Sequence, residues 1–522
     1  MRRALWTLCV SLQRLDASMA ESNSYRQILR STSIIGGASV ISILVGLVRI
    51  KVAAMLLGPT GVGLIGLFTN LIATASTVAG LGFGSVGTRQ IAQASASGDE
   101  ARISTARRAL FWGTLGLSLL GAIAFWCLRE VLARHAMQDA ALADDVGWLA
   151  LAVALSVASA SQNALLNGMR RIGDIARVSI GSALLSSAVG IIALWVWGRS
   201  GILAFIVAAP LASFVLSHWY VSRLPRVRGG VQLRDLTREW GTLARLGFAF
   251  MVAGLAGTVG QLVVRLLIQR ELGIAALGQF HAAWAISMTY IGFVLGAMGT
   301  DYYPRLAAII EDHPAVNRLV NEQIEVALLL AAPVLLAMLG LAPWVIELLY
   351  SREFAEAATV LRWQVLGDVL KIASWPLGFI LIASGAGKMF MATEWMAMGL
   401  FGVSTWLLLP YAGLVATGLS FLLMYSAYLI LVFWLANRRT RFQFQPGVIC
   451  LLGFVAVAAA AVMVMSAFSN MVAAIVGMAT AAGFAIYALV RLAHAGTVGG
   501  GVGRLASIVR TALRGLGVWR ER

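Results

Sequence analysis

The sequence of 522 residues is 60% hydrophobic and only 12% charged, with a mean hydropathy of +0.84. Soluble domains usually carry about 25% charged residues, so this composition excludes an ordinary soluble protein and indicates a polytopic membrane protein. The net charge of +17 would suit a nucleic-acid-binding protein, but the basic residues cluster between apolar segments, which is typical of membrane topology. We therefore expect membrane lipid, and no nucleic acid, as a partner.

The first twenty residues, MRRALWTLCVSLQRLDASMA, leave two alternatives open. A basic start followed by a short apolar run resembles a signal peptide, although Arg14 and Asp16 interrupt the region that would precede cleavage. Alternatively, Met19 is the first residue of the protein.

Fourteen apolar runs are long enough to cross a bilayer, whose hydrocarbon core of about 30 Å needs about 20 helical residues. Helices satisfy every backbone polar group internally, so we predict an all-α polytopic membrane protein of about fourteen transmembrane helices. The runs lie near 31–57, 63–84, 109–128, 147–166, 176–197, 201–221, 246–268, 281–300, 326–350, 360–384, 389–409, 411–436, 447–467 and 470–491.

Basic residues predict the orientation. With the N-terminus in the cytoplasm, the cytoplasmic segments hold 30 Lys plus Arg and the opposite loops hold 6. This bias predicts that both termini are cytoplasmic. No outer loop is longer than about twenty residues, so we expect no extracytoplasmic domain that could hold enzyme chemistry.

Two halves of the chain repeat each other. LLGPTGVG (56–63) follows the first predicted helix and ELGIAALG (271–278) follows the seventh, at an offset of 215. Six helices separate the copies, which predicts a parallel repeat like that of transporters whose lobes rock about a central site. The expected parts are an N-terminal segment (1–30), an N-lobe (31–221), a linker (222–245), a C-lobe (246–436), two additional helices (447–491) and a basic tail (492–522). Within the tail, residues 503–522 predict an amphipathic helix on the inner leaflet, the alternative being a disordered basic segment.

Five charged residues inside the predicted spans are the main candidate site residues, because an ionised side chain in hydrocarbon is costly. They predict a water-filled, net positive cavity between the lobes that suits an anionic substrate such as pyrophosphate. The alternative is that they form structural ion pairs or reach the membrane interface. They are Arg49, Lys51, Arg265, Asp368 and Lys371.

Polar and aromatic side chains on the same helices are weaker candidates, since such residues more often serve packing. Asn70, Gln261 and Trp363 are assigned to substrate binding, with Asn163, Tyr290 and Gln364 as further polar or aromatic positions. Glu394 joins Asp368 as a candidate ion-coupling carboxylate.

Motifs for catalysis or metal binding are missing from the sequence. GFGSVG (82–87) and SGAGKM (384–389) resemble nucleotide-binding loops but lack the strand context or the required spacing. The three cysteines are too far apart for a disulfide framework or a zinc site. We therefore predict neither an enzyme nor a bound metal or cofactor.

Two segments identify a resemblance to a known family. GGASVISILVGLVRIKVAAMLLGPTGVGLIGLF (36–68) and LLYSREFAEAATVLRWQVLGDVLKIASWPLGFILIASG (348–385) resemble the Wzx-type flippases of O-antigen and enterobacterial common antigen. These belong to the polysaccharide-exporter branch of the superfamily that includes the MATE multidrug transporters. The likeness covers roughly residues 25–440, and the two helices beyond it are similar to the fourteen-helix lipid II flippases.

The resemblance implies two six-helix lobes that move undecaprenyl-pyrophosphate-linked oligosaccharide across the bacterial inner membrane by alternating access. A proton or sodium gradient is the expected driving force, and a glycan polymerase and chain-length proteins are the expected partners. It places the substrate contacts on Arg49, Lys51, Arg265, Asp368 and Lys371. A lipid II-type flippase and a MATE-like multidrug exporter are the alternatives.

Overall fold

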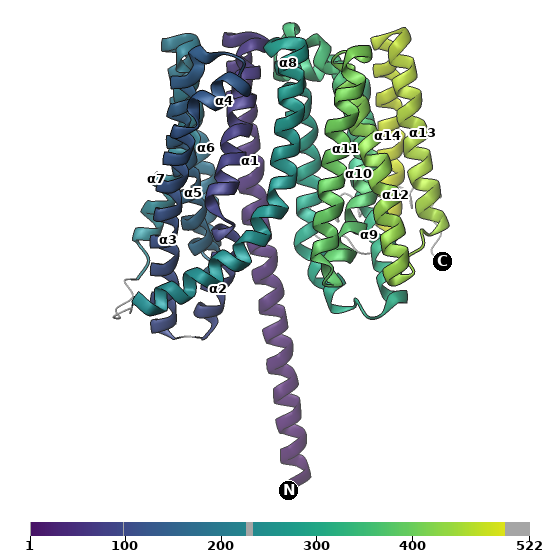
Figure 1. Ribbon diagram of the computed structural model, residues 1–522. Helices are drawn as coiled ribbons and strands as arrows, with labels where there is room; N and C mark the ends of the chain where they lie inside the picture. The colour runs from purple at the N-terminus through teal and green to yellow at the C-terminus, as the bar shows by residue number, and fades with distance from the viewer. Residues whose placement is uncertain (1, 98, 226–232, 496–522) are drawn as a thin grey trace. The chain divides into compact units, whose positions relative to one another are not determined.

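The computed structural model describes residues 2–97, 99–225 and 233–495, and every regular element in those ranges is helical. Figure 1 shows the helices. They are α1 (Arg2–Gly80), α2 (Phe83–Ser97), α3 (Glu100–Cys127), α4 (Arg129–His135), η1 (Ala140–Leu142), α5 (Ala143–Gly168), α6 (Ile172–Trp197), η2 (Gly198–Gly201), α7 (Ile202–Ser222), α8 (Leu233–Ala308), α9 (His313–Leu349), η3 (Arg352–Phe354), α10 (Ala355–Ala383), α11 (Gly387–Ala412), α12 (Val415–Thr440), α13 (Pro446–Phe468) and α14 (Asn470–Ala495). The prediction of an all-α protein is confirmed.

The predicted number of membrane crossings agrees with the helices. Eleven helical stretches of the described chain are long and apolar enough to span a membrane. Three of them, Ile34–Gly80, Ile172–Ser222 and Leu236–Gly296, have 47, 51 and 61 residues, each more than twice the length that one crossing needs. Counting these three as two crossings each gives the predicted fourteen. The predicted tail helix at 503–522 lies outside the described residues.

The chain forms two compact units. Of the described residues, the first unit contains 2–49, 75–97, 99–130, 142–225 and 233–251, and the second contains 50–74, 131–141 and 252–495. The lobes predicted at 31–221 and 246–436 stay a prediction.

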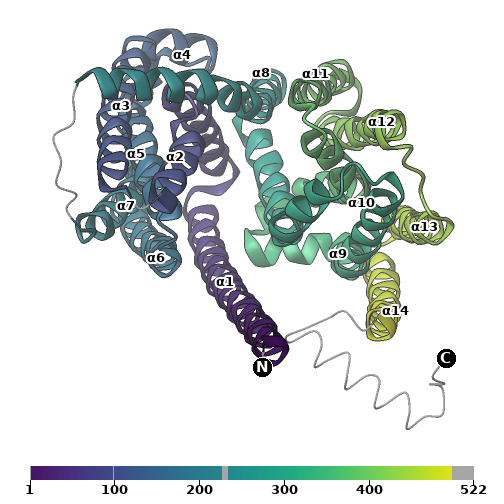
Figure 2. The ribbon, with the colours of Figure 1, turned by 90° about the horizontal axis from the view of Figure 1, so that it is seen from below.

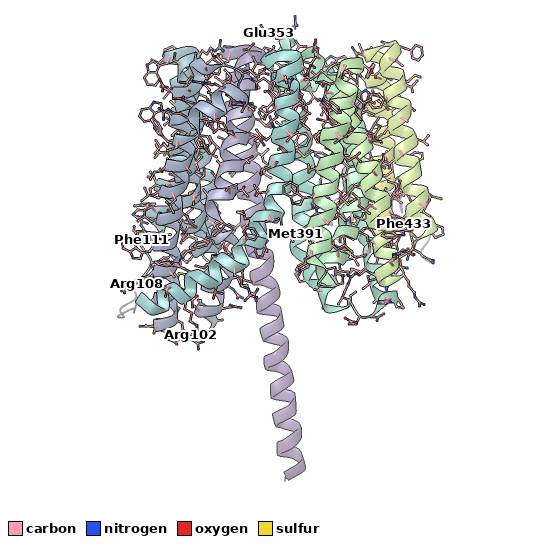
Figure 3. The ribbon with its side chains drawn as sticks, viewed as in Figure 1. Arg102, Arg108, Phe111, Glu353, Met391 and Phe433 are labelled. Atoms are coloured by element: carbon pink, nitrogen blue, oxygen red, sulfur yellow. The ribbon has the colours of Figure 1, made fainter. Side chains whose placement is uncertain are left out.

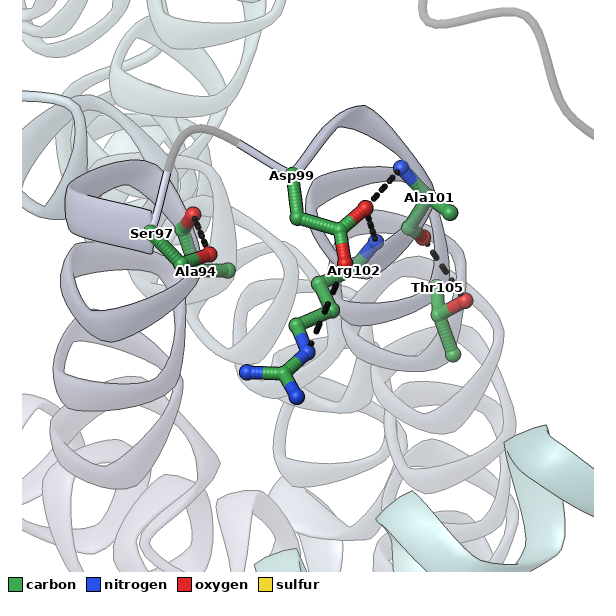
Figure 4. Close-up of polar contacts among 6 residues, drawn as sticks. All are labelled: Ala94, Ser97, Asp99, Ala101, Arg102 and Thr105. Atoms are coloured by element: carbon green, nitrogen blue, oxygen red, sulfur yellow. Dashed lines mark hydrogen bonds and ion pairs between the residues drawn. The ribbon is translucent and has the colours of Figure 1, made fainter.

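In the first unit, α5 packs against α2, α3 and α7, and α7 packs against α6 (Figure 2). Arg102 and Arg108 lie at one end of this unit, beyond Phe111 (Figure 3). The turn into α3 is capped by Asp99, whose Oδ1 accepts from the backbone N–H of Ala101 at 2.9 Å and Arg102 at 3.3 Å (Figure 4). Such a cap satisfies helix N–H groups that have no partner within the helix.

In the second unit, α10 is the central helix and packs against α9, α11, α12 and α13. In the span that contains it, 67% of the most apolar window is buried within the protein, the largest share of any span in the described chain. Helix α14 packs against α9 and α13 (Figure 2). Charged residues on α10 are therefore held away from lipid by neighbouring helices.

The two longest helices bend at equivalent positions of the predicted repeat. Gly58 in α1 has φ 63° and ψ −168°, and Gly273 in α8 has φ 84° and ψ 176°. This backbone conformation is essentially restricted to glycine. The positions are 215 residues apart, the offset found in the sequence, so the two bends support the predicted repeat.

Candidate functional site

Glycines on α10 and α12 allow these helices to approach closely around the predicted charges. A Cβ atom built on Gly367 would lie 2.6 Å from Cδ1 of Phe421, and one on Gly418 would lie 2.5 Å from Cβ of Trp363. Small residues at such crossings let membrane helices pack tightly. Trp363, predicted to bind substrate, is thus half-buried against α12.

Asp368 is completely buried on α10. Its Oδ2 accepts a hydrogen bond of 2.6 Å from the hydroxyl of Ser287 on α8. Within the described residues, its Oδ1 has no hydrogen-bond partner, and neither do the two amide atoms of Gln364 one turn earlier. Buried polar atoms without partners are uncommon in proteins and are often found where a protein binds water, an ion or a ligand.

Lys371 lies one turn beyond Asp368 and interacts electrostatically with the carboxylates of Asp368 and Glu394, but it forms no direct ion pair with either. Its ammonium contacts the sulfur of Met288 at 3.3 Å and lies 5.3 Å from the ring centre of Tyr425. Thioether sulfur is a weak acceptor, and a ring face attracts a cation without neutralising it. Among the described residues, no ion pair includes Lys371 or Asp368. The lysine charge is therefore available to an anion.

A cavity of about 280 Å³ lies beside Lys371, between α10, α11 and α12. Glu394 lies on its α11 wall, one turn after Met391, which Figure 3 labels. The hydroxyl of Tyr428 donates to Oε1 of Glu394 at 2.6 Å. The lining residues are Lys371, Ser374, Trp375, Phe379, Phe390, Glu394, Ala397, Met398, Met424, Tyr425 and Tyr428.

This cavity combines one cation, one carboxylate and several aromatic rings. It can hold a small polar ligand with an anionic group near Lys371 and hydrogen-bond donors near Glu394. A ring of such a ligand would pack against the aromatic side chains. Lys371 and Glu394 were both predicted as site residues and lie in the same cavity. Asp368, Arg265, Gln261 and Trp363 are not among its lining residues.

Arg265 is a second buried cation in this unit, with 3% of its surface exposed. Its Nη1 lies 3.0 Å from Nδ1 of His281, and its guanidinium lies 5.6 Å from the ring centre of Phe280. Its buried Nε has no hydrogen-bond partner in the part of the chain that the structure describes. Arg265 therefore keeps both its charge and a free donor.

Arg49 and Lys51 are held by backbone carbonyl groups. In the first unit, the Arg49 guanidinium lies 4.0 Å from the ring centre of Phe205 and donates to the carbonyl oxygen of the same residue. In the second unit, Nζ of Lys51 donates to the carbonyl oxygen of Glu347 at 2.8 Å, in the last turn of α9. A cation near a helix C-terminus is stabilised by the helix dipole, which applies to Lys51 at the end of α9. The substrate-binding role of Arg49 and Lys51 stays a prediction.

Two other predicted residues are placed in the second unit without joining the cavity. Asn70 is buried, and its Oδ1 has no partner among the described residues. Gln261 is half-buried on α8, one turn before Arg265. The predicted chamber between the lobes stays a prediction.

A second cavity, of about 240 Å³, lies within the first unit. Hydroxyl groups rather than charges line it, and the buried hydroxyls of Ser76 and Thr114 have no partner within the described chain. Its lining residues are Ser76, Thr77, Gly80, Phe83, Gly84, Thr114, Ser156, Val157, Ala160 and Ser161. Such a surface can hydrogen-bond to a neutral polar ligand.

Several residues of these sites were missed by the sequence analysis. His281, Ser287, Tyr425 and Tyr428 approach the predicted charges from α8 and α12, helices that carry them at ordinary positions of apolar runs. One signal was available for His281. The repeat offset places it opposite Gly66, so the two copies differ strongly in side-chain size and polarity at this position.

The chain is similar in sequence to known proteins of one family. Residues 52–359 match the model of a family described as polysaccharide biosynthesis protein. The lipid III flippase of Escherichia coli (strain K12) is 24% identical over 420 residues, which cover 77% of this chain and 97% of that flippase. The family match includes Asn70, Gln261 and Arg265 but ends before Asp368.

Two solved structures are similar in fold. An inward-facing MATE multidrug transporter of the MOP superfamily has a TM-score of 0.64 and 16% identity, covering 77% of this chain and 94% of that one. Lipid II flippase MurJ in an inward closed conformation has a TM-score of 0.64 and 12% identity, covering 86% of this chain and 97% of that one. The predicted MOP-type polytopic fold is confirmed. The relatives named here are flippases and a transporter, in agreement with the prediction that the chain is not an enzyme.

Proposed function

The chain belongs to the family of polysaccharide biosynthesis proteins, as the resemblance in its sequence predicted, and on this premise we propose that it is a flippase for lipid-linked glycans. The substrate we propose is an undecaprenyl-pyrophosphate-linked oligosaccharide, such as an O-antigen repeat unit. It crosses the bacterial inner membrane by alternating access. Partners of the same pathway would be a glycan polymerase and chain-length proteins.

One observation carries this proposal. Arg265 and Lys371 are cations inside a membrane unit, and within the described residues neither forms a direct ion pair with a carboxylate. A charge at this depth is costly, so it is retained where it contacts a substrate or an ion. Guanidinium and ammonium groups bind phosphate oxygens through short, charge-assisted hydrogen bonds. A diphosphate head group is therefore the ligand that these residues fit.

The cavity beside Lys371 supplies the contacts for a sugar. The rings of Trp375 and Tyr425 offer faces for the apolar side of a pyranose, and Glu394 accepts hydrogen bonds from sugar hydroxyls. Within this proposal, a sugar near the diphosphate occupies the cavity.

Asp368 is the carboxylate that we assign to coupling with a proton or sodium gradient. It is buried, and its Oδ2 already accepts from Ser287, whereas its Oδ1 is unpaired in the described chain. A proton or a sodium ion at Oδ1 would neutralise the carboxylate, and the charge balance with Lys371 three residues later would change. Asp368→Asn keeps the size of the side chain and removes this change, so export should stop responding to the ion gradient.

Rescue of defined flippase-null strains tests the function. The wild-type chain should restore one surface polysaccharide, and Lys371→Ala should not restore it although the protein reaches the membrane at normal levels. If no flippase-null strain regains any surface glycan, the proposed function is wrong. If Lys371→Ala and Asp368→Ala both export normally, the roles assigned to these two residues are wrong.

The second candidate is a lipid II-type flippase. The observation that favours it is the coverage of this chain by lipid II flippase MurJ, 86%, against 77% by the MATE transporter. Rescue of a strain depleted of its lipid II flippase distinguishes the two substrates. Restored growth of that strain would indicate lipid II, and restored surface polysaccharide in the other null strains would indicate a polysaccharide repeat unit.

A multidrug exporter is the third candidate. Glu394 and the tyrosines of the cavity would suit a cationic drug, but Lys371 on the same cavity repels one. Increased drug resistance without any restored glycan would favour this candidate over the two flippases.

A further inference from the structure

Arg265 and His281 lie on the two helical halves of α8, on either side of the bend at Gly273. Each is eight residues from Gly273, so both lie about 12 Å from the bend at 1.5 Å per residue. The bend therefore returns the chain so that Nη1 of Arg265 meets Nδ1 of His281 at 3.0 Å.

The chemistry of the two groups decides which one donates. A guanidinium has N–H donors and no acceptor, so Nδ1 of His281 must accept the hydrogen bond with its lone pair. The imidazole then carries its proton on Nε2 and is neutral. A protonated imidazole could not accept this bond and would be a second cation beside the first.

Gly66 provides the space for this pair. A Cβ atom on Gly66 would lie 2.6 Å from Cγ and Nδ1 of His281 and 3.0 Å from Nη1 of Arg265. Gly66 and His281 are 215 residues apart, the repeat offset, so they are equivalent positions that face each other. The imidazole of His281 thus fills the space left free because Gly66, the equivalent residue of the other repeat, has no side chain.

An imidazole fixes a guanidinium without neutralising it. A carboxylate in the place of His281 would hold Arg265 more strongly but would cancel the charge that an anionic ligand needs. With His281 as the partner, Arg265 keeps its full positive charge and, within the described residues, an unpaired Nε.

We propose that His281 is a positioning residue for the proposed flippase. Through its unprotonated Nδ1 it holds the Arg265 guanidinium in the orientation that binds the diphosphate of the lipid-linked substrate. The assignment rests on the proposed function, because it gives Arg265 an anionic ligand.

Binding of undecaprenyl pyrophosphate to the full-length protein in lipid nanodiscs tests the assignment. Arg265→Gln should weaken binding about tenfold, since a charge-assisted hydrogen bond is lost. His281→Leu should weaken it by a similar factor. His281→Asn should bind like wild type, because the Asn Oδ1 can accept from Arg265 in place of the imidazole nitrogen.

A double variant separates positioning from a general structural role. Arg265→Gln with His281→Leu should bind no more weakly than Arg265→Gln alone, because His281 acts through the arginine. Additive losses, or His281→Asn as weak as His281→Leu, would overturn the assignment.

Two further outcomes distinguish this assignment from the proposed function. Wild-type binding by His281→Leu together with weak binding by Arg265→Gln overturns the role of His281 and leaves the flippase proposal in place. Wild-type binding by both variants would show that Arg265 does not bind the diphosphate. It would overturn both the substrate contact of Arg265 in the proposed function and the positioning role of His281. Nitrogen-15 NMR of histidine-labelled wild-type protein gives a readout that does not depend on transport, and a proton on Nδ1 of His281 would contradict the assignment.

Discussion

Gly63 of α1 and Gly278 of α8 contact each other as equivalent members of the internal repeat. A Cβ atom on Gly63 would overlap the carbonyl oxygen of Ile274 and lie 3.0 Å from the amide nitrogen of Gly278. A Cβ atom on Gly278 would overlap the carbonyl oxygen of Pro59. Pro59 and Ile274 are also separated by the repeat offset of 215, so the contact is reciprocal. This is the pattern of a local two-fold axis, where each copy presents the same surface to the other.

Any side chain at this contact must push two backbones apart. Gly63→Ala and Gly278→Ala should each lower the free energy of unfolding by about 1–3 kcal/mol, the usual cost of overpacking. Gly292→Ala, on the same helix α8 as Gly278, is the matched control, because a Cβ atom on Gly292 would have no atom within 4 Å. Thermal unfolding of the purified variants in detergent measures the difference. Melting temperatures equal to that of Gly292→Ala would show that the helices are free to separate here.

A second prediction concerns backbone conformation without any contact. Gly273 has a φ of +84° and open space around its missing Cβ, so Gly273→Ala tests conformational strain alone. We expect a loss of about 1–3 kcal/mol in unfolding free energy. Gly399→Ala also has open space but no positive φ, and it should be neutral or slightly stabilising. If both substitutions behave alike, α8 does not need the bend at Gly273.

Much of the fold could be predicted because hydrophobic length alone determines a membrane-spanning helix. The repeat also predicted that Gly58 and Gly273 are equivalent, and the structure gives both the same unusual backbone. The extension of α8 back to Leu233 was not predicted, because its basic and polar residues carry no hydropathy signal.

The partners of the predicted charges could not be derived from the sequence. Arg49 was predicted to line a cavity, and nothing in its own segment indicated that its guanidinium contacts the ring and carbonyl oxygen of Phe205, 156 positions away. Asp368 and Lys371 lie one turn apart on α10, yet the Ser287 hydroxyl that binds the carboxylate comes from α8. Such pairings depend on how the helices pack, and helical periodicity within one segment does not specify this.

The lysines of this chain provide a direct comparison of the cavity with the surface. Lys371→Met should reduce glycan export by about tenfold or more, because the ammonium that faces the cavity is lost while the side-chain volume is kept. Lys388→Met should leave export unchanged, since Lys388 is exposed at the start of α11. Surface-polysaccharide levels in a complemented null strain measure both. Equal export by the two variants would remove Lys371 from the transport path.

Arg362, six residues before Asp368 on α10, anchors α14 and is not among the residues that line the cavity. Its Nη2 donates to Oδ1 of Asn470 at 2.9 Å, and its Nε donates to the carbonyl oxygen of Leu339 at 3.2 Å. Arg362→Met and Asn470→Ala should destabilise the protein by less together than the sum of their separate effects, with a coupling energy of about 1.5–3 kcal/mol. Thermal unfolding of the single and double variants gives this energy. Additive effects would mean that the hydrogen bond between Arg362 and Asn470 does not help to hold α14.

The last prediction concerns the carboxylate of the cavity. Tyr428 donates to Glu394 at 2.6 Å, and a carboxylate that loses a donor in a low-dielectric site becomes more costly to keep ionised. Tyr428→Phe should therefore reduce export about tenfold, by weakening the position and charge of Glu394 against the sugar. Tyr411→Phe is the matched control, because Tyr411 is 89% exposed and lies outside the cavity. Glu394→Gln should reproduce the loss, and combining it with Tyr428→Phe should add little, because both act on one hydrogen bond. Full export by Tyr428→Phe would show that the substrate does not depend on this carboxylate.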